Sequence, residues 1–193
     1  FVPLTFGYTG IVYFTYDVAF ERGLVDKNGQ PNRLHHDAAR ANREVAHLGR
    51  ALRFLTSTQI GCVPGSHRED GKLVANAVRR GTRELDLSAQ PLRGIAIESP
   101  GKNQDVMLGM FRDDQRGRYF MVTNLWHDAD TVAADRALSV TLRLGPEVRE
   151  LHRVNRLTGE VEQLPIREGS VQIRLPGGTG DLFKVDDGKF PGL

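Results

Sequence analysis

The sequence has few of the features that mark disulfide-bonded, membrane-spanning or secreted proteins. Its single cysteine, Cys62, excludes an internal disulfide, and we expect this thiol to be a small buried side chain rather than a nucleophile. The longest apolar run covers about residues 10–14, which is too short to span a bilayer. No signal peptide is recognisable. Because the chain begins with Phe1 rather than Met, we expect upstream sequence, and the localisation stays open.

An excess of clustered charge of one sign is also missing. Twenty-six Lys and Arg residues are nearly matched by 24 Asp and Glu residues, and the two signs are interspersed. The densest basic spot, Arg79, Arg80 and Arg83, is followed at once by Glu84 and Asp86. Such a pattern is typical of a solvated surface, so we expect no nucleic-acid partner. With 39% hydrophobic and 26% charged residues, the composition is that of a globular protein.

The first third of the chain predicts one strand, one turn and one helix. Residues 10–16 are rich in β-branched and aromatic side chains, as in a strand, and residues 26–31 carry the Asn-Gly and Pro signals of a turn. From Leu34 onward, apolar or small residues recur in steps of three and four, which predicts an amphipathic helix. These residues are Leu34, Ala38, Ala41, Val45, Leu48, Leu52 and Leu55.

After about Thr58 the helical period gives way to short strand-like runs separated by turn signals. Residues 139–144 and 171–175 alternate between apolar and polar side chains, which predicts sheets with one buried face. Hairpin-length connections are expected at residues 114–117 and 167–169. The role of residues 64–93 is left open. The predicted strands cover residues 59–63, 94–98, 105–112, 118–125, 137–144, 148–154, 160–165, 170–175 and 181–185.

Together these patterns predict an α+β chain in two parts. A lone parallel-type strand with one amphipathic helix leaves both strand edges unpaired and one helix face uncovered. Residues 1–58 are therefore interpreted as the last β/α unit of a truncated (β/α)8 barrel, and residues 59–193 as an antiparallel β-sandwich domain.

Several motifs of the first part resemble the end of a TIM-barrel glycoside hydrolase of the β-galactosidase-like type. They are G-I-V-Y-F-T-Y at residues 10–16, the D-x-x-G-x-P turn at residues 26–31, and the helical Asn42-Arg43-Glu44-Val45 and Leu48-Gly49. The second part resembles the C-terminal β domain of the same enzymes. Its motifs are Phe111-Arg112-Asp113, Y-F-M-V-T-N at residues 119–124, Leu157-Thr158-Gly159 and P-G-G-T-G-D-L-F at residues 176–183.

The resemblance implies hydrolysis of a glycosidic bond by two carboxylates, which in these enzymes follow the fourth and seventh barrel strands. The chain aligns from just before the eighth strand, so both carboxylates would lie upstream of it. We therefore assign no catalytic residue, no cofactor and no metal to this chain, and expect it to be inactive by itself.

Substrate contacts are expected where the eighth strand ends, because barrel ligands bind at the C-terminal ends of the strands. Side chains of a strand point alternately to its two faces, and the more polar face carries Tyr13, Thr15 and Asp17. We assign this face to the barrel interior, where Asp17 and Thr15 would form hydrogen bonds with sugar hydroxyls. Related enzymes usually have an aromatic residue at this position, on which the sugar stacks. This chain has Asp17 there instead, so Tyr16 or Phe20 would supply the aromatic ring. The alternative is that Tyr13 and Thr15 only pack the barrel.

The remaining candidates have simpler interpretations. Glu21 and Asp26 are read as solvated loop acids. The run His35-His36-Asp37 is read as a helix start rather than a metal site, because adjacent histidines point to different helix faces. Trp126 is either a sugar-stacking ring or a packing residue.

The sequence thus predicts a C-terminal fragment of a glycoside hydrolase acting on poly- or oligosaccharides, with a β-linked or galactose-like unit as substrate. Carbohydrate would be its partner through the missing barrel, and neither membrane nor nucleic acid is expected. A non-catalytic carbohydrate-binding module and a purely structural β domain remain as alternatives. Self-association is left open.

Overall fold

The computed structural model describes residues 1–13, 16–17, 23–63, 68–69, 72–73, 85–88, 90–98, 105–127 and 131–193. Antiparallel strands dominate this part of the chain, accompanied by helix α1 (Val2–Thr5), helix α2 (Arg33–Leu52) and the 3-10 turn η3 (Ala133–Arg136). No described helix combines the length and hydropathy that a transmembrane span requires. The strands are β1 (Thr56–Val63), β2 (Arg68–Glu69), β3 (Lys72–Leu73), β4 (Leu92–Glu98), β5 (Val106–Arg112), β6 (Arg118–Asn124), β7 (Leu138–Leu144), β8 (Leu151–Val154), β9 (Val161–Leu164), β10 (Ser170–Leu175) and β11 (Gly180–Val185).

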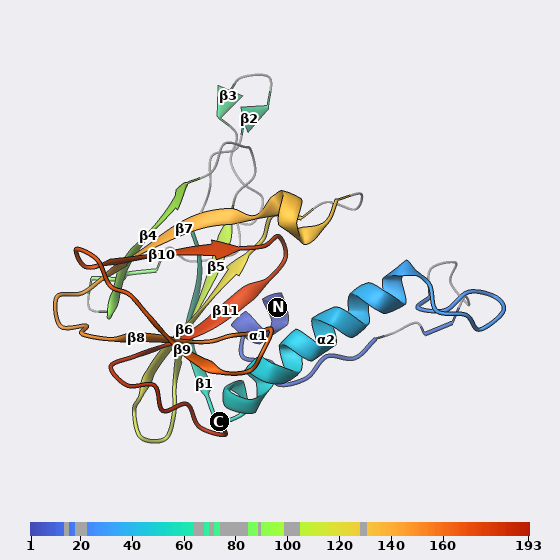
Figure 1. Ribbon diagram of the computed structural model, residues 1–193. Coiled ribbons are helices and arrows are strands. Elements are labelled where there is room, and N and C mark those ends of the chain that lie inside the picture. Colours follow the sequence, from blue (N-terminus) through green and yellow to red (C-terminus); the bar gives the residue numbers. More distant parts are fainter. Residues whose placement is uncertain are drawn as a thin grey trace.

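Two antiparallel sheets form a sandwich-like body (Figure 1). The larger sheet has the strand order β1-β5-β6-β11-β8-β9, and the smaller one has the order β10-β7-β4. Strands β2 and β3 form a separate two-stranded ribbon. The predicted antiparallel sandwich is therefore confirmed, and the chain is a mostly-β protein with a small helical part.

The main hydrophobic core lies between the two sheets. Leu142 of β7 and Ile173 of β10 belong to the same buried cluster as Phe120 of β6 and Phe183 of β11. The last two rings stack with their centroids 5.0 Å apart. In β7 and β10 buried positions alternate with more exposed ones, as their sequence pattern predicts.

A second apolar cluster covers the outer face of the six-stranded sheet. Helix α1 and the C-terminal end of α2 supply Leu4, Leu48 and Leu52, which pack against Met121 and Leu182 of the sheet. The close approach of α1 depends on a glycine. A Cβ atom at Gly109 of β5 would lie 2.3 Å from the Thr5 carbonyl oxygen, so no other residue fits without a shift of α1.

Each of the nine predicted strands is present, with bounds that differ by a few residues. Residues 114–117 form the expected hairpin turn between β5 and β6. The expected hairpin turn at residues 167–169 is also present, because Arg167 and Ser170 exchange both backbone hydrogen bonds, at 2.9 and 2.8 Å. This turn is tight, but it connects β9 of the larger sheet to β10 of the smaller one, and β10 pairs with β7 instead. Chain reversal alone therefore does not decide which strand becomes the neighbour.

The strand predicted at residues 10–16 is not present in the described part of this segment. Residues 10–13 and Tyr16 belong to no strand. A strand needs a neighbour for its backbone groups, and in Figure 1 the segment runs beside α2, away from both sheets. The segment has the β-branched and aromatic residues of a strand, but among the described residues it has no neighbouring strand to pair with.

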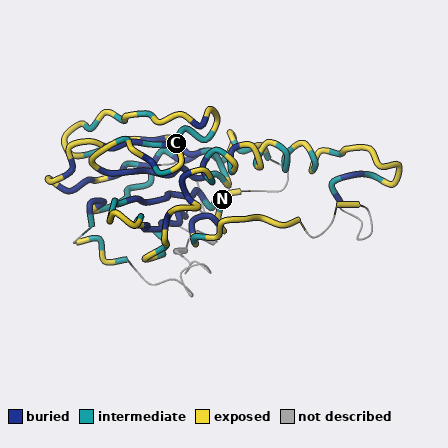
Figure 2. Tube along the Cα trace, turned by 90° about the horizontal axis from the view of Figure 1, so that it is seen from below, coloured by how far each residue is buried: buried dark blue, intermediate teal, exposed yellow. Residues whose placement is uncertain are grey.

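Helix α2 is confirmed, but its apolar stripe is only partly covered. Leu48 and Leu52 are buried against the sheet, whereas Leu34 near the other end is 49% exposed. In Figure 2 the projecting part of the chain is mostly exposed or intermediate tube, with a short buried stretch at its far end. We call residues 8–13 and 16–17, together with residues 33–43 of α2, the apolar arm.

The core predicts a large effect of truncating Phe183. Replacing this fully buried ring, Phe183→Ala, removes its stacking on Phe120 and leaves a cavity between the sheets. We expect the free energy of unfolding, measured by urea denaturation, to fall by about 3–5 kcal/mol. Leu157→Ala serves as the control, because Leu157 is 65% exposed and its loss should change stability by less than about 0.5 kcal/mol. Equal effects of the two substitutions would contradict the described core.

Candidate functional site

The sequence-predicted substrate residues lie on the apolar arm. Tyr13 donates a hydrogen bond from its hydroxyl to the Asn42 Oδ1 atom at 2.8 Å, which ties the segment to α2. Tyr16 is 63% exposed, and its carbonyl oxygen accepts hydrogen bonds from the amides of Leu24 and Val25 at 2.8 and 3.0 Å. Thr15 lies outside the described residues, as does Phe20. The arm thus brings Tyr13 close to α2 and leaves much of the Tyr16 side chain facing solvent.

The backbone near Asp17 folds back on itself. A Cβ atom at position 23 would fall 1.7 Å from the Asp17 carbonyl oxygen, so only glycine allows this crossing. The next segment closes with a turn in which Asp26 Oδ1 accepts hydrogen bonds from the amides of Asn28 and Gln30, both at 2.8 Å. Gly29 has a φ of 75° there. The turn predicted at residues 26–31 is confirmed, and Asp26 has a structural part in it.

A buried group of charges holds α2 on the six-stranded sheet. Arg156, in the β8–β9 turn, donates from Nε to Glu44 Oε2 of α2 at 3.0 Å and from Nη1 to Asp181 Oδ1 of β11 at 2.5 Å. The Arg156 and Glu44 side chains are each 11% exposed, and that of Asp181 is 1% exposed. Charges at this depth need partners, because transfer out of water costs several kcal/mol per unpaired ion. We call Glu44, Arg156 and Asp181 the α2 ion cluster.

The cluster continues toward the sheet edge through Arg153. Its guanidinium bonds Asp181 at 3.1 Å and Glu162 at 2.7 Å. The hydrogen bond from Arg153, together with one from Asn155, lowers the pKa of the Glu162 carboxyl. A carboxyl whose folded pKa lies below its unfolded value, about 4.3, stabilises the fold above that pH. This contribution is lost as the pH falls through the folded pKa.

A second polar contact of α2 uses the same turn. The Nδ1 atom of His47 donates to the Arg156 carbonyl oxygen at 2.7 Å. His47 also covers Gly159, whose φ is 77° and whose Cβ, if present, would lie 3.1 Å from the imidazole ring. The Thr158-Gly159 motif is therefore part of the surface that receives α2.

The remaining candidate residues have structural roles. Asn32 caps α2 by accepting from the His35 amide at 3.1 Å, and Asp37 pairs with Arg40 at 3.0 Å. No three His, Cys, Asp or Glu side chains converge on a metal-binding geometry in the described ranges. The helix-start interpretation of residues 35–37 is thus consistent with the structure. Glu21 lies outside the described residues.

Trp126 packs against the main core, whereas Cys62, which was expected to be buried, is only half-buried. The Trp126 ring is partly buried against the main core, and the Arg136 guanidinium lies 5.1 Å from its centroid. This contact places a charged group over the ring that a sugar would need for stacking. Burial and the Asp105 carboxylate raise the pKa of the Cys62 thiol to about 11. At neutral pH the thiolate that a nucleophile requires is therefore scarce.

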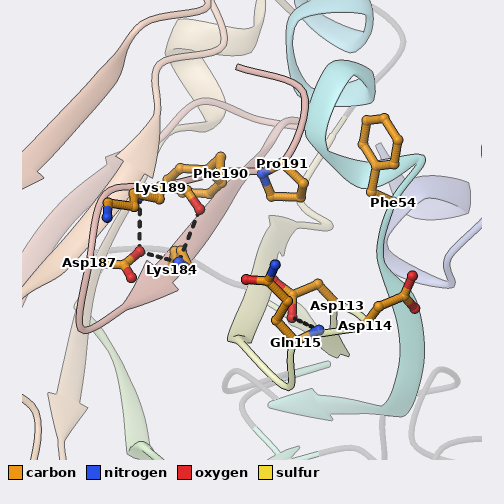
Figure 3. A pocket seen from close by; sticks show the side chains of 9 residues that line it. All are labelled: Phe54, Asp113, Asp114, Gln115, Lys184, Asp187, Lys189, Phe190 and Pro191. Atoms are coloured by element: carbon orange, nitrogen blue, oxygen red, sulfur yellow. Dashed lines mark hydrogen bonds and ion pairs between the residues drawn. The ribbon is translucent and has the colours of Figure 1, made fainter.

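A groove of about 370 Å³ opens at the end of the six-stranded sheet (Figure 3). It is formed by the β5–β6 turn, the end of β11, the C-terminal tail and the turn after α2. Its lining residues are Phe54, Asp113, Asp114, Gln115, Lys184, Asp187, Lys189, Phe190 and Pro191. Sequence reasoning missed this groove, because its walls come from segments that are more than 50 residues apart in the chain.

Comparisons with known proteins were made at three levels. No protein family, no curated protein and no solved structure matches the chain. Functional interpretation therefore depends on the residues and the geometry described above.

The α2 ion cluster predicts strong destabilisation when its central cation is removed. Arg156→Ala leaves Glu44 without its buried partner and weakens the pairing of Asp181. We expect a loss of about 3 kcal/mol in the free energy of unfolding, measured by urea denaturation.

The matched control is Arg118→Ala, which removes the exposed ion pair between Arg118 and Asp186. Solvent screens this pair, so the loss should stay below about 1 kcal/mol. Similar losses for both variants would show that the buried cluster has no special weight.

Proposed function

We propose that this chain is the C-terminal portion of a TIM-barrel glycoside hydrolase that acts on poly- or oligosaccharides. Residues 1–58 would supply the last strand and helix of the barrel, and residues 59–193 its β-sandwich scaffold. The two catalytic carboxylates would lie upstream, and the chain by itself would be inactive.

The observation that carries this proposal is the apolar arm. Val12 is 94% exposed, and Ile11, Tyr13, Tyr16 and Leu34 are between 39% and 63% exposed. Apolar side chains gathered on a projecting segment mark a surface that is normally covered by a partner. Closure of a barrel would cover them, because the last strand pairs with both of its neighbours and the last helix packs on the outside.

The direction of the arm also supports the proposal. Among the described residues, helix α2 is held on the sandwich by its C-terminal half, through Leu48, Leu52, His47 and the α2 ion cluster. Its N-terminal half and the preceding loop extend away from both sheets (Figures 1 and 2). This arrangement leaves space beside the arm for a large α/β body, while the sandwich fixes one of its helices.

The proposal predicts what the whole reading frame encodes. Upstream of Phe1 we expect about one barrel's length of alternating strands and helices, with an Asn-Glu pair and a later Glu at strand ends. Protein produced from the whole frame should hydrolyse an aryl β-galactoside or a related aryl glycoside, and conversion of either Glu to Gln should abolish the hydrolysis. A frame without such an upstream body would refute the proposal.

The proposed substrate contact can be tested in the same whole-frame protein. Asp17→Asn should raise KM for the glycoside about tenfold, since a charged hydrogen bond to a sugar hydroxyl contributes on the order of 1.5 kcal/mol. Lys27→Ala is the control, because Lys27 is exposed in the turn that follows. An unchanged KM for Asp17→Asn would remove Asp17 from the substrate site and favour a packing role for this segment.

A further inference from the structure

The groove at the end of the six-stranded sheet has a framework of mutually bonded groups around Asp113, which is half-buried. The Tyr119 hydroxyl donates to Asp113 Oδ2 at 2.7 Å, and the Gly117 and Gln115 amides donate to Asp113 Oδ1 at 2.7 and 3.0 Å. Burial by itself would raise the pKa of the Asp113 carboxyl, but these hydrogen bonds outweigh burial and lower it. Asp113 is therefore an ionised residue that shapes the turn and has little capacity left for a ligand.

Lys184 places a buried ammonium group in the groove wall. Its side chain is 8% exposed, and its Nζ atom donates to Asp187 Oδ1 and, at 3.0 Å, to the Lys189 carbonyl oxygen. The Tyr119 ring lies beneath it, with its centroid 5.5 Å from Nζ. An ammonium group has three N–H donors. Two of them meet an oxygen acceptor among the described residues, and the Tyr119 ring also faces the ammonium group.

The rim of the groove carries polar groups that are not used by the fold. The side chains of Asp114, Gln115 and Lys189 are exposed and have no hydrogen-bond partner among the described residues. In Figure 3 Asp114 and Gln115 stand on one side, and the C-terminal tail with Pro191 on the other. Phe54 and Pro191 add apolar surface to this rim.

We propose that this groove binds a neutral saccharide. Three carboxylates and two ammonium groups line it. The excess of negative charge disfavours an anion, and the ammonium groups of Lys184 and Lys189 disfavour a bare cation. A sugar hydroxyl suits both signs, because it accepts from an ammonium group and donates to a carboxylate or an amide oxygen. The C–H surface of a pyranose ring fits the apolar rim at Phe54 and Pro191. Polar groups placed around a small apolar surface are the usual composition of a ligand site.

This inference goes beyond the proposed function and does not depend on it. All the lining residues belong to this chain, so a saccharide would bind whether or not a barrel precedes it. A failure of the groove to bind would leave the hydrolase proposal unaffected, and the reverse is also true.

The test uses the 193-residue chain and three neutral trisaccharides, namely β-1,4-galactotriose, cellotriose and xylotriose. We expect at least one of them to bind with a Kd in the millimolar range, measured by calorimetry. In a ¹⁵N NMR titration, the amides of residues 113–117 and 186–190 should shift. The double variant Asp114→Ala/Gln115→Ala should weaken binding about tenfold, which corresponds to roughly 1.4 kcal/mol. Both positions are exposed, so the variant should fold normally.

Two control variants and an anionic probe complete the experiment. Glu160→Ala removes an exposed acid from another hairpin of the same sheet, and Trp126→Ala tests the alternative sugar-stacking ring. Both should leave binding unchanged, and trigalacturonate should bind less tightly than the neutral trisaccharides. The proposal is overturned if no neutral trisaccharide binds, if the double variant binds like the native chain, if only Trp126→Ala abolishes binding, or if trigalacturonate is preferred.

Discussion

The contact between α2 and the outer face of the six-stranded sheet is the interaction on which the rest of the structure depends. Leu48 and Leu52 supply the apolar part of this contact, and Arg156 lies between Glu44 of the helix and Asp181 of the sheet. The apolar part stabilises the contact without fixing the helix in register. The ion cluster adds the specificity, because Arg156 reaches both carboxylates in only one position of α2.

The same contact explains why half of α2 projects from the body. The sheet receives the helix only from Glu44 onward, whereas the apolar stripe begins a full ten residues earlier at Leu34. The apolar stripe of α2 is thus longer than the part of the sheet that covers it, which indicates that a second surface covers the rest of the stripe. In the proposed enzyme that surface is the barrel, so α2 would be shared between the barrel and the sandwich, and the ion cluster would set how the two are joined.

Local patterns predicted most of the fold, and long-range contacts account for what they missed. Alternation in residues 139–144 and 171–175 identified β7 and β10, and the three-and-four spacing from Leu34 identified α2. Residues 10–13 and Tyr16 do not form the predicted strand, because strand formation needs a partner, which the described chain does not supply. The turn at residues 167–169 was predicted correctly, but a tight turn does not reveal that β10 pairs with β7 of the smaller sheet instead of β9.

The sites were less predictable than the fold. Glu44 and Asp181 lie within motifs of the resemblance, and Arg156 directly precedes a third motif, but no spacing indicates that the three side chains pair. They pair only because the sheet order brings β8, β11 and α2 together. The groove was equally unpredictable from the sequence. Asp114 and Lys189 line it together only because the C-terminal tail passes the β5–β6 turn. The motif at residues 157–159 lies next to the α2 ion cluster, since Gly159 is covered by His47 of α2. The motif did not indicate the ion cluster itself.

Hydrogen exchange along α2 tests the central claim most directly. In the 193-residue chain, amides of residues 44–52 should be strongly protected, while those of residues 37–43 should exchange much faster, because no sheet packs on that half of the helix. In protein from the whole reading frame, the two halves should be equally protected and protection should extend to residues 10–13. Uniform protection of α2 in the 193-residue chain itself would contradict the account, since the apolar arm would then need no further body.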